Sequence, residues 1–252
     1  MFQTIRNAFK IKEIRKRLFF TFLMLIVVRI GSQLPLPGVD PDVFKQLFGN
    51  TGDSLNFFNA ITGGSFEQMS VFALSITPYI TSSIIIQLLT ISFPKLEEMQ
   101  RDGEDGRKKL NRITRYVTIG LSVMESLAMA IGFGRSGYLS HFNFPYVLMM
   151  VAVLTAGATA LMWIGERITK NGVGNGISIV LVINIVSRLP QDVTTLFNQF
   201  IKGQTIARGI LIGVIIAAII IGIVVLVVIL QCAERRIPVQ YSRKLQGVGR
   251  AT

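Results

Sequence analysis

GGSFEQMSVFALSITPYITSSIIIQLLTISF, residues 63–93, decides the class of this protein. The stretch is long and apolar enough to enter a membrane, yet a glycine pair (Gly63 and Gly64), polar side chains and Pro78 interrupt it. Hydrocarbon offers no partner for freed backbone groups, so such an interruption is tolerated where the backbone meets protein or a water-filled cavity. Interrupted membrane segments of this kind occur at the working sites of transport proteins. The stretch therefore suggests a route through a membrane, and a kinked helix packed through small residues is an equally good alternative.

The composition indicates a polytopic, all-α membrane protein. Half of the 252 residues are hydrophobic and the mean hydropathy is +0.54, and several apolar runs approach the span of a bilayer. The single cysteine, Cys232, excludes an internal disulfide framework, and with the single histidine, His141, we expect no metal site and no other cofactor. The net charge of +12 fits contact with anionic headgroups or with nucleic-acid phosphate.

Apolar runs predict six transmembrane helices. The second span is the interrupted one, with a short helix near Ser65–Phe72 and a stronger helix near Ala73–Phe93. The other five spans are expected at residues 18–34, 116–133, 144–164, 173–189 and 206–230, of which the last is the clearest membrane signal. Residues 1–17 read as a retained amphipathic segment rather than a cleaved signal. No soluble domain is visible, so residues 1–252 form a single membrane domain.

The distribution of basic residues predicts the orientation. Of the 26 lysines and arginines, 20 lie in loops on one side of these spans. Loops rich in Lys and Arg stay on the cytoplasmic side. Both the N-terminus and the tail after Leu230 are therefore expected to be cytoplasmic, as an even number of spans requires.

Two apolar pairs share helix faces. Ile76 and Ile80 in the second span are four residues apart, and so are Leu181 and Ile185 in the fifth. The fifth span is entered through three glycines: Gly172, Gly174 and Gly176. Glycines let one backbone approach another closely, although an ordinary tight turn is the simpler alternative.

Two polar side chains fall inside spans. Glu125 lies near the middle of the third span, where a charge is expensive and often functional. We expect a structural hydrogen-bonding role for Glu125 rather than proton transfer, and Asn184 calls for the same caution. These residues and the broken second span motivate one alternative, a small-solute or ion transporter. A membrane scaffold, in which the broken span only packs, is another.

Five separated motifs resemble those of bacterial SecY, the channel-forming subunit of the general protein translocase. They are IRKRLFFTFLMLIVVRIGSQLPLPGVD (14–40), GGSFEQMSVFALSITPYITSSIIIQLL (63–89), EDGRKKLNRITRY (104–116), GNGISIVLVINIV (174–186) and ERRIPVQYSRK (234–244). They stand in the order and spacing of that family and cover essentially the whole chain. The resemblance implies two halves of five helices each, related by a pseudo-two-fold axis in the membrane plane and clasping an hourglass pore. This chain ends after the sixth helix, so we expect an incomplete piece of a longer subunit that is not a competent channel alone.

The resemblance also implies roles for particular residues. A plug on the external side corresponds to residues 62–72, with its hinge at Gly63 and Gly64 and with plug residues Ser65, Phe66 and Met69. The apolar ring at the waist of the pore corresponds to Ile76, Ile80, Leu181 and Ile185. One side of a lateral gate corresponds to residues 73–89 and includes Thr81, Ile84, Ile85, Gln87 and Leu88. Such a channel passes unfolded secretory polypeptides, releases apolar segments sideways into lipid, and is not an enzyme.

The partners implied by the resemblance lie in the bacterial inner membrane and on its cytoplasmic face. They are the subunits SecE and SecG, the ATPase SecA, the ribosome with its RNA, signal sequences, nascent chains and membrane lipid. Residues 231–252 correspond to the start of the cytoplasmic docking loop. Candidate docking residues for the ribosome or SecA are Arg235, Arg236, Arg243, Lys244, Arg107, Lys108 and Lys109. Charge alone favours the simpler interpretation that these residues follow the positive-inside rule, and phosphate contact would be salt-sensitive.

Overall fold

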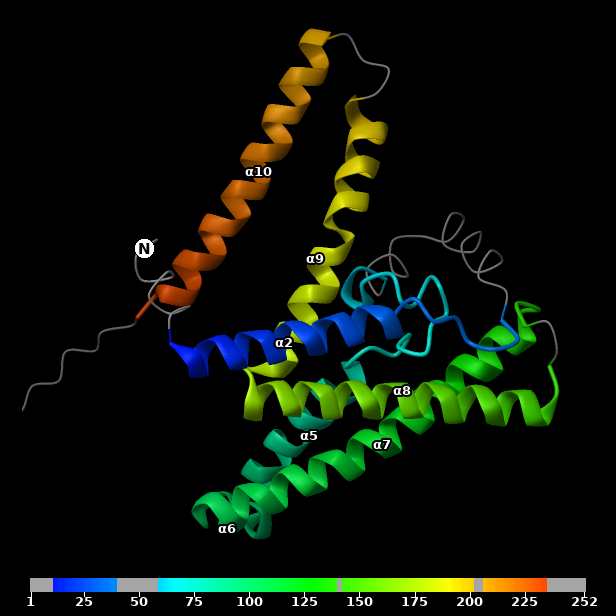
Figure 1. Cartoon of the computed structure of the whole chain (residues 1–252), viewed down its shortest axis with the longest axis vertical. Helices are drawn as coiled ribbons and strands as arrows, with labels where there is room; N and C mark the ends of the chain where they lie inside the picture. Colours follow the sequence, from blue (N-terminus) through cyan, green and yellow to red (C-terminus); the bar gives the residue numbers. More distant parts are fainter. Residues whose placement is uncertain (1–10, 40–58, 140–141, 202–205, 235–252) are drawn as a thin grey trace, which may run out of the picture. The chain divides into compact units, whose positions relative to one another are not determined.

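The computed structural model describes residues 11–39, 59–139, 142–201 and 206–234, and these residues are predominantly helical (Figure 1). The helices are α2 (Lys12–Gly31), α5 (Thr77–Ser92), α6 (Pro94–Arg101), α7 (Gly103–Arg135), α8 (Phe144–Asn171), α9 (Gly176–Leu196), the π-helix η1 (Phe197–Ile201) and α10 (Ile206–Cys232). Within the described ranges, β-pairing is limited to the isolated bridges Pro35–Ser70 and Val39–Leu139. The prediction of an all-α fold is confirmed. Contacts divide the chain into two units, Met1–Gln191 and Asp192–Thr252.

Four stretches of the described chain are long and apolar enough to cross a membrane: Gly103–Arg135, Phe144–Asn171, Gly176–Phe200 and Arg208–Cys232. The bent pair α5 and α6 is a fifth candidate, with an angle of 103° between its helices. Helix α2 falls short by composition because its first turns carry Lys12, Arg15, Lys16 and Arg17. The count of six spans and the orientation of the ends therefore stay predictions.

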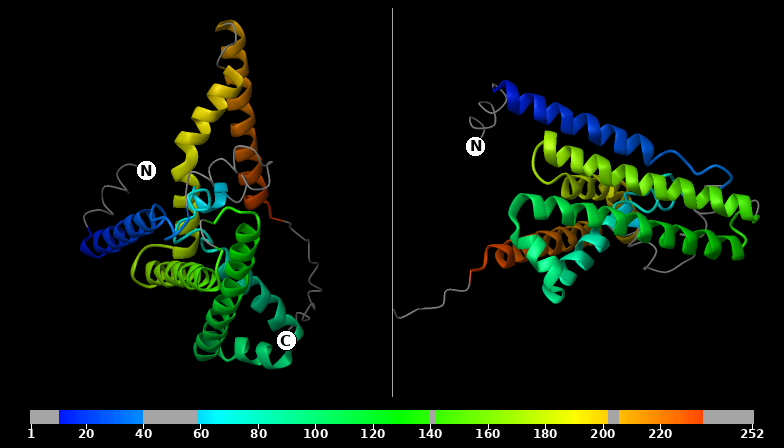
Figure 2. Two further views of the ribbon diagram at one scale, coloured as in Figure 1. Left: turned by 90° about the vertical axis from the view of Figure 1, so that its right-hand side faces the viewer. Right: turned by 90° about the horizontal axis from the view of Figure 1, so that it is seen from below.

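Helices α7 and α8 pack side by side through small residues (Figure 2). Every fourth residue of α7 is buried, and most of them are small: Gly106, Leu110, Thr114, Thr118, Ser122, Ser126, Ala130 and Gly134. Small side chains let membrane helices approach closely. A hydrogen bond between the hydroxyls of Ser126 and Thr155 (3.3 Å) links the two helices midway. Residues four apart are neighbours on a helix surface, and because a turn has 3.6 residues this stripe winds gradually around α7.

Helix α5 begins at Thr77, so the predicted helix start at Ala73 is wrong. Pro78 lies in the first turn of α5, where its missing N–H and fixed φ do no harm. Pro78 therefore starts a helix and does not kink one. The face of α5 that carries Pro78, Ser82, Ile86 and Thr90 is buried, and α5 packs against α7.

Residues 59–76, which we call the turn segment, hold an irregular path between helices. The short helix predicted near Ser65–Phe72 is wrong, because residues 63–69 and 71–76 form turns. Left-handed φ values interrupt any helix at Gly63 (68°), Gly64 (86°), Met69 (42°) and Ser75 (53°). None of residues 59–76 is exposed. The segment is drawn in cyan in Figure 1 and lies against α2 and α8, where Phe72 meets Gly31 and Val71 meets Gly157.

The described part of the first unit has two apolar clusters, and the turn segment contributes to both. One cluster joins Met69, Ala73 and Leu74 to α8 through Met150, Leu154 and Ala158. The other joins Phe72 and Ile76 to α2, α8 and α9 through Val28, Leu161, Ile164, Ile168 and Val180. The core of this unit is therefore organised around an irregular segment rather than around a helix–helix seam alone.

In the second unit, α10 presents apolar side chains on all sides. Among its residues from Arg208 to Cys232, only Gly209 is buried, and nearly all the rest are exposed. A helix that is hydrophobic all round needs an apolar environment. The most apolar span of the described chain is thus one whose surface is left for lipid or for other helices.

Candidate functional site

Most backbone amides of the turn segment donate hydrogen bonds within the protein. The amides of Gly64 and Ser70 donate to the carbonyls of Asn59 (3.0 Å) and Ser65 (2.9 Å). Across the chain, Val71 donates to Leu34 and Leu36 donates to Met69, both at 2.9 Å. Irregular backbone at membrane depth needs such partners. The interruption read from the sequence is therefore accommodated by protein contact.

Polar side chains tie the turn segment to two helices. Arg29 of α2 donates from Nη1 to the carbonyl oxygen of Gly63 (3.4 Å). Asn184 of α9, only 3% exposed, donates from Nδ2 to the hydroxyl of Ser75 (3.3 Å). Arg188 of α9 forms an ion pair with Glu67 (3.7 Å). The segment is thus tied to α2 and to α9.

Glycines permit the close packing of the segment. A Cβ at Gly63 would lie 2.7 Å from the carbonyl oxygen of Asn184, and one at Gly157 would overlap the carbonyl oxygen of Val71. No described atom lies within 4 Å of a Cβ placed at Gly64. Of the two predicted hinge glycines, Gly63 is therefore required both by its φ angle and by a neighbouring backbone, and Gly64 by its φ angle alone.

The four predicted ring residues lie in different environments. Ile76 is 1% exposed and is the N-cap residue of α5, so it packs inside the cluster with Leu161 and Val180. Ile80 and Leu181 pack partly buried against the same cluster. Ile185 is 47% exposed. Three of the four residues thus meet around one cluster, and Ile185 does not belong to it.

The predicted gate residues lie on the open side of α5. Ile84, Ile85, Gln87 and Leu88 are exposed, and Thr81 is half-buried. They face away from the stripe of α5 that includes Ser82 and Ile86. The helix thus has one packed face and one free apolar face in the described part of the chain.

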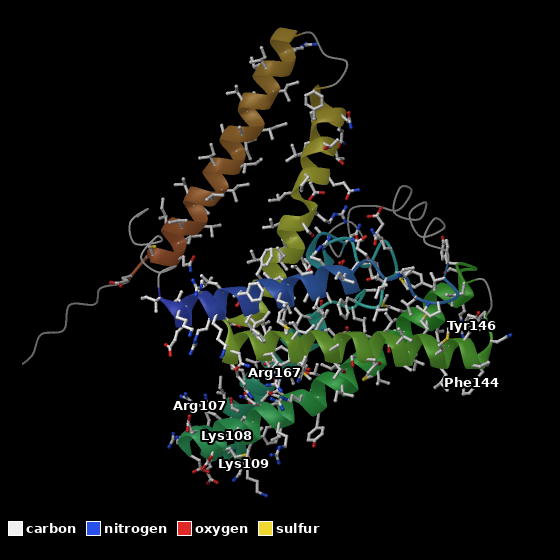
Figure 3. The ribbon with its side chains drawn as sticks, in the orientation of Figure 1. Arg107, Lys108, Lys109, Phe144, Tyr146 and Arg167 are labelled. Carbon is white, nitrogen blue, oxygen red and sulfur yellow. The ribbon has the colours of Figure 1, made fainter. Side chains whose placement is uncertain are left out.

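Basic residues gather at one end of the first unit. Figure 3 shows Arg107, Lys108 and Lys109 at the start of α7, far from Phe144 and Tyr146 at the start of α8. Arg115 of α7 donates two hydrogen bonds to the carboxylate of Glu166 in α8 (2.7 and 2.6 Å). The basic start of α7 and the basic end of α8 therefore meet. The other docking candidates, Arg235, Arg236, Arg243 and Lys244, lie outside the described residues.

Hydroxyl groups fix the glycine-rich entry to α9. The hydroxyl of Thr169 accepts a hydrogen bond from the amide of Gly176 (2.9 Å), and Thr21 accepts one from Val173 (3.2 Å). A Cβ at Gly176 would overlap the carbonyl oxygen of Gly165. The entry is therefore a close backbone approach between α8 and α9, as the glycine spacing allowed. It also places the middle of α2, at Thr21, beside the end of α8.

Glu125 and Asn184 behave differently. Asn184 is buried and donates a hydrogen bond to the hydroxyl of Ser75. Within the described residues, Glu125 makes no hydrogen bond or ion pair, so its expected role stays a prediction. Nor do His, Cys, Asp and Glu side chains of the described chain gather into a group of three that could hold a metal ion.

Sequence reasoning missed several residues that hold the turn segment: Arg29, Asn59, Glu67 and Arg188. Two of them carried a usable signal. Arg29 and Arg188 are charges close to the ends of apolar runs, where a partner is needed. Neither sequence spacing nor composition could indicate that their partners are Gly63 and Glu67, because the members of each pair lie far apart in the chain.

A family profile for SecY matches residues 70–252, more than half of the chain. Three bacterial proteins named protein translocase subunit SecY are similar over nearly all of it. The protein of Pseudomonas aeruginosa is 41% identical and matches 94% of this chain, that of Halalkalibacterium halodurans is 40% identical over 98%, and that of Staphylococcus carnosus is 42% identical over 97%. The matches cover 53%, 58% and 58% of those proteins, so the chain spans little more than half the length of these relatives.

Two solved structures share the fold. One is described as the structure of a protein conducting channel, with a TM-score of 0.53 and 19% identity over 78% of this chain and 42% of that one. The other is described as Sec61 in the canine ribosome-channel complex from the endoplasmic reticulum, with a TM-score of 0.57 and 19% identity over 93% of this chain and 54% of that one. At this identity the likeness concerns the fold alone.

Proposed function

This chain belongs to the SecY family, and from that premise we propose that it forms part of a protein-conducting channel subunit in the bacterial inner membrane. It would contribute one wall of the pore, its external barrier and one side of a lateral gate. The helices α7, α8 and α10 make it a multi-pass membrane protein. Unfolded secretory polypeptides are the proposed substrates, and no bond-forming chemistry is assigned to it.

The observation that carries the proposal is the buried, irregular turn segment. Eighteen residues without an exposed member run between membrane helices in a non-regular conformation for most of their length. A passive anchor or scaffold gains nothing from placing turns at this position, because a helix would satisfy the same backbone groups more simply. In a channel, the same segment supplies a plug that has its own packing site and its own hinge, at Gly63 and Gly64.

The positions of the four residues are compatible with the proposed apolar ring. Ile80 and Leu181 are partly buried and Ile185 is exposed, so they can present apolar surface to a pore, while Ile76 anchors the ring to α8 and α9. An apolar constriction disfavours water and ions because nothing there replaces their hydration. An extended polypeptide can pass with the ring closed around it.

The open face of α5 suits a lateral gate. Ile84, Ile85 and Leu88 are apolar and unpacked in the described chain. A gate helix must contact the opposite half of the channel when closed and lipid or a signal sequence when open, and an apolar face serves for all three. Sufficiently apolar segments of a substrate would then partition sideways into lipid.

The partners are proposed from the family and from charge. SecE and SecG would be neighbouring subunits. SecA and the ribosome would supply the driving energy from the cytoplasmic side. Arg107, Lys108 and Lys109 are exposed at the start of α7, where they can reach an acidic protein surface or RNA phosphate. The canine Sec61 structure described as a ribosome-channel complex supports a ribosome as partner for this family.

Crosslinking tests the channel proposal. Single cysteines at positions 80, 181 and 185, in a complete channel subunit that contains this sequence, should capture a polypeptide arrested during translocation. The matched control is a cysteine at Ile220, an exposed position of α10. Equal capture from position 220, or capture from none of the ring positions, would contradict the channel proposal. Capture of a small solute analogue instead of a polypeptide would favour the transporter.

A further inference from the structure

The turn segment meets α9 at three points along a short stretch of that helix. Asn184 donates from Nδ2 to the hydroxyl of Ser75 at 3.3 Å. Arg188 pairs with Glu67 at 3.7 Å. The backbone of Asn184 lies so close to Gly63 that a Cβ there would be 2.7 Å from its carbonyl oxygen. Because residues four apart share a helix face, Asn184 and Arg188 present both side-chain ties from one face of α9.

Polar contacts of the segment converge on Glu67. Asn59 donates from Nδ2 to the Glu67 carboxylate at 2.6 Å, and the amide of Glu67 donates to Oδ1 of Asn59 at 3.2 Å. The side chain of Glu67 is 25% exposed and that of Arg188 is 16% exposed. Charges this far from water lose hydration that their partners must replace, so removing one of the two weakens the compensation of the other.

The backbone of the segment is held in a conformation that it would not choose alone. Met69 and Ser75 both have left-handed φ angles, 42° and 53°. Such angles are unfavourable for residues with a Cβ and persist where the surroundings impose them. Ser75 is the residue that accepts the hydrogen bond from Asn184. A contact from α9 thus coincides with one of the two strained positions.

We propose that α9 is a latch for the turn segment, with Arg188 and Asn184 as positioning residues. While α9 stays in place, the Arg188–Glu67 pair and the Asn184–Ser75 hydrogen bond keep the segment buried. When α9 is displaced, both contacts are lost together. The backbone strain at Met69 and Ser75 and the freedom of Gly63 then favour movement of the segment out of its buried position. That the freed segment is a pore barrier rests on the proposed function, whereas the latch itself rests on the contacts of this chain.

The latch can be tested by the accessibility of a single cysteine. Ser65→Cys places the reporter at a buried position of the segment, in a background with the native cysteine removed by Cys232→Ser. The chain is reconstituted in lipid vesicles, and the rate of labelling by a membrane-impermeant maleimide is measured. We expect Arg188→Gln and Glu67→Gln each to raise this rate about tenfold, and Arg188→Lys to leave it near that of the parent.

Two further variants make the result specific. The double variant Glu67→Gln with Arg188→Gln should label more slowly than the product of the two single effects would give, because both changes remove one shared interaction. Glu97→Gln removes an exposed ion pair with Arg101 on α6 and should leave the rate unchanged. The latch is overturned if Arg188→Gln labels at the parental rate, if Arg188→Lys labels as fast as Arg188→Gln, or if the two single effects multiply.

This measurement stands apart from the test of channel function. Labelling of the reporter thiol at position 65 needs no transported polypeptide, no partner subunit and no energy source. If the variants raise the labelling rate but the chain captures no polypeptide, the latch proposal stands and the channel proposal fails. If the chain captures polypeptide but the labelling rate is unchanged, the channel proposal stands and the latch proposal fails.

Discussion

The turn segment and α10 show opposite relations between hydrophobicity and burial. The turn segment contains two glycines and several polar residues, yet every one of its residues is at least half-buried. Helix α10 is the most apolar span of the described chain and has no buried residue in its apolar window. In a water-soluble protein the apolar helix would be buried and the polar segment exposed. A bilayer, in contrast, solvates apolar side chains and cannot solvate free backbone groups. In the described chain, the most apolar helix is therefore largely exposed, and the interrupted segment is packed inside protein.

Replacement of isoleucine by alanine in each region should give the largest difference in unfolding free energy between them. Ile76→Ala removes a side chain packed among Leu161, Ile164 and Val180, and it should lower the free energy of unfolding by about 3 kcal/mol because it leaves a cavity. Ile220→Ala removes an equal volume from a residue that is 51% exposed and should have little effect. Thermal or denaturant unfolding in detergent micelles measures both. Equal losses would contradict the assignment of the two environments.

Substitutions at the neighbouring residues Gly63 and Gly64 separate the energetic effect of close packing from that of backbone conformation. Gly63→Ala places a Cβ against the backbone of Asn184 and retains a left-handed φ, so we expect a loss of about 2 kcal/mol. Gly64→Ala retains only the left-handed φ, with no described atom within 4 Å, and should cost about 1 kcal/mol. The difference in unfolding free energy between these variants measures the approach of α9. If the two losses are equal, α9 does not lie against Gly63.

The hydrogen bond between Ser75 and Asn184 should contribute less. Ser75→Ala leaves a buried amide donor without its acceptor, with an expected loss of about 1 kcal/mol. Ser92→Ala is the matched control, because Ser92 is exposed and bonds only within its own helix. Chemical denaturation of the two variants provides the measurement. A loss confined to Ser92→Ala would reverse the interpretation.

A gain of stability is expected in α10. No described atom lies within 4 Å of a Cβ placed at Gly222, so Gly222→Ala should favour the helix by about 0.5 kcal/mol or more through lower backbone entropy in the unfolded chain. Circular dichroism during thermal unfolding tests it. A loss of stability would mean that a partner helix packs closely at Gly222.

Sequence reasoning worked where the physics is local. The predicted apolar spans overlap α7, α8, α9 and α10, and the glycine-rich entry to α9 allowed the close approaches that the structure contains at Gly172 and Gly176. It failed at residues 65–72, where the turns depend on contacts with Leu34, Leu36 and α9 rather than on local propensity. The pairs Asn184–Ser75 and Thr21–Val173 lie 109 and 152 residues apart in the chain. No single-sequence pattern encodes such partners.

Ion conductance across a planar bilayer tests the central claim most directly. The claim is that the region around the turn segment closes a pore, whereas α10 faces an apolar surround. In a complete subunit containing this sequence, Ile80→Gly combined with Ile185→Gly should raise the resting ion leak, because the apolar constriction loses its side chains. The same pair of changes at Ile219 and Ile220 of α10 should leave the leak at the parental level. An unchanged leak in the first variant, or an equal increase in both, would contradict the account.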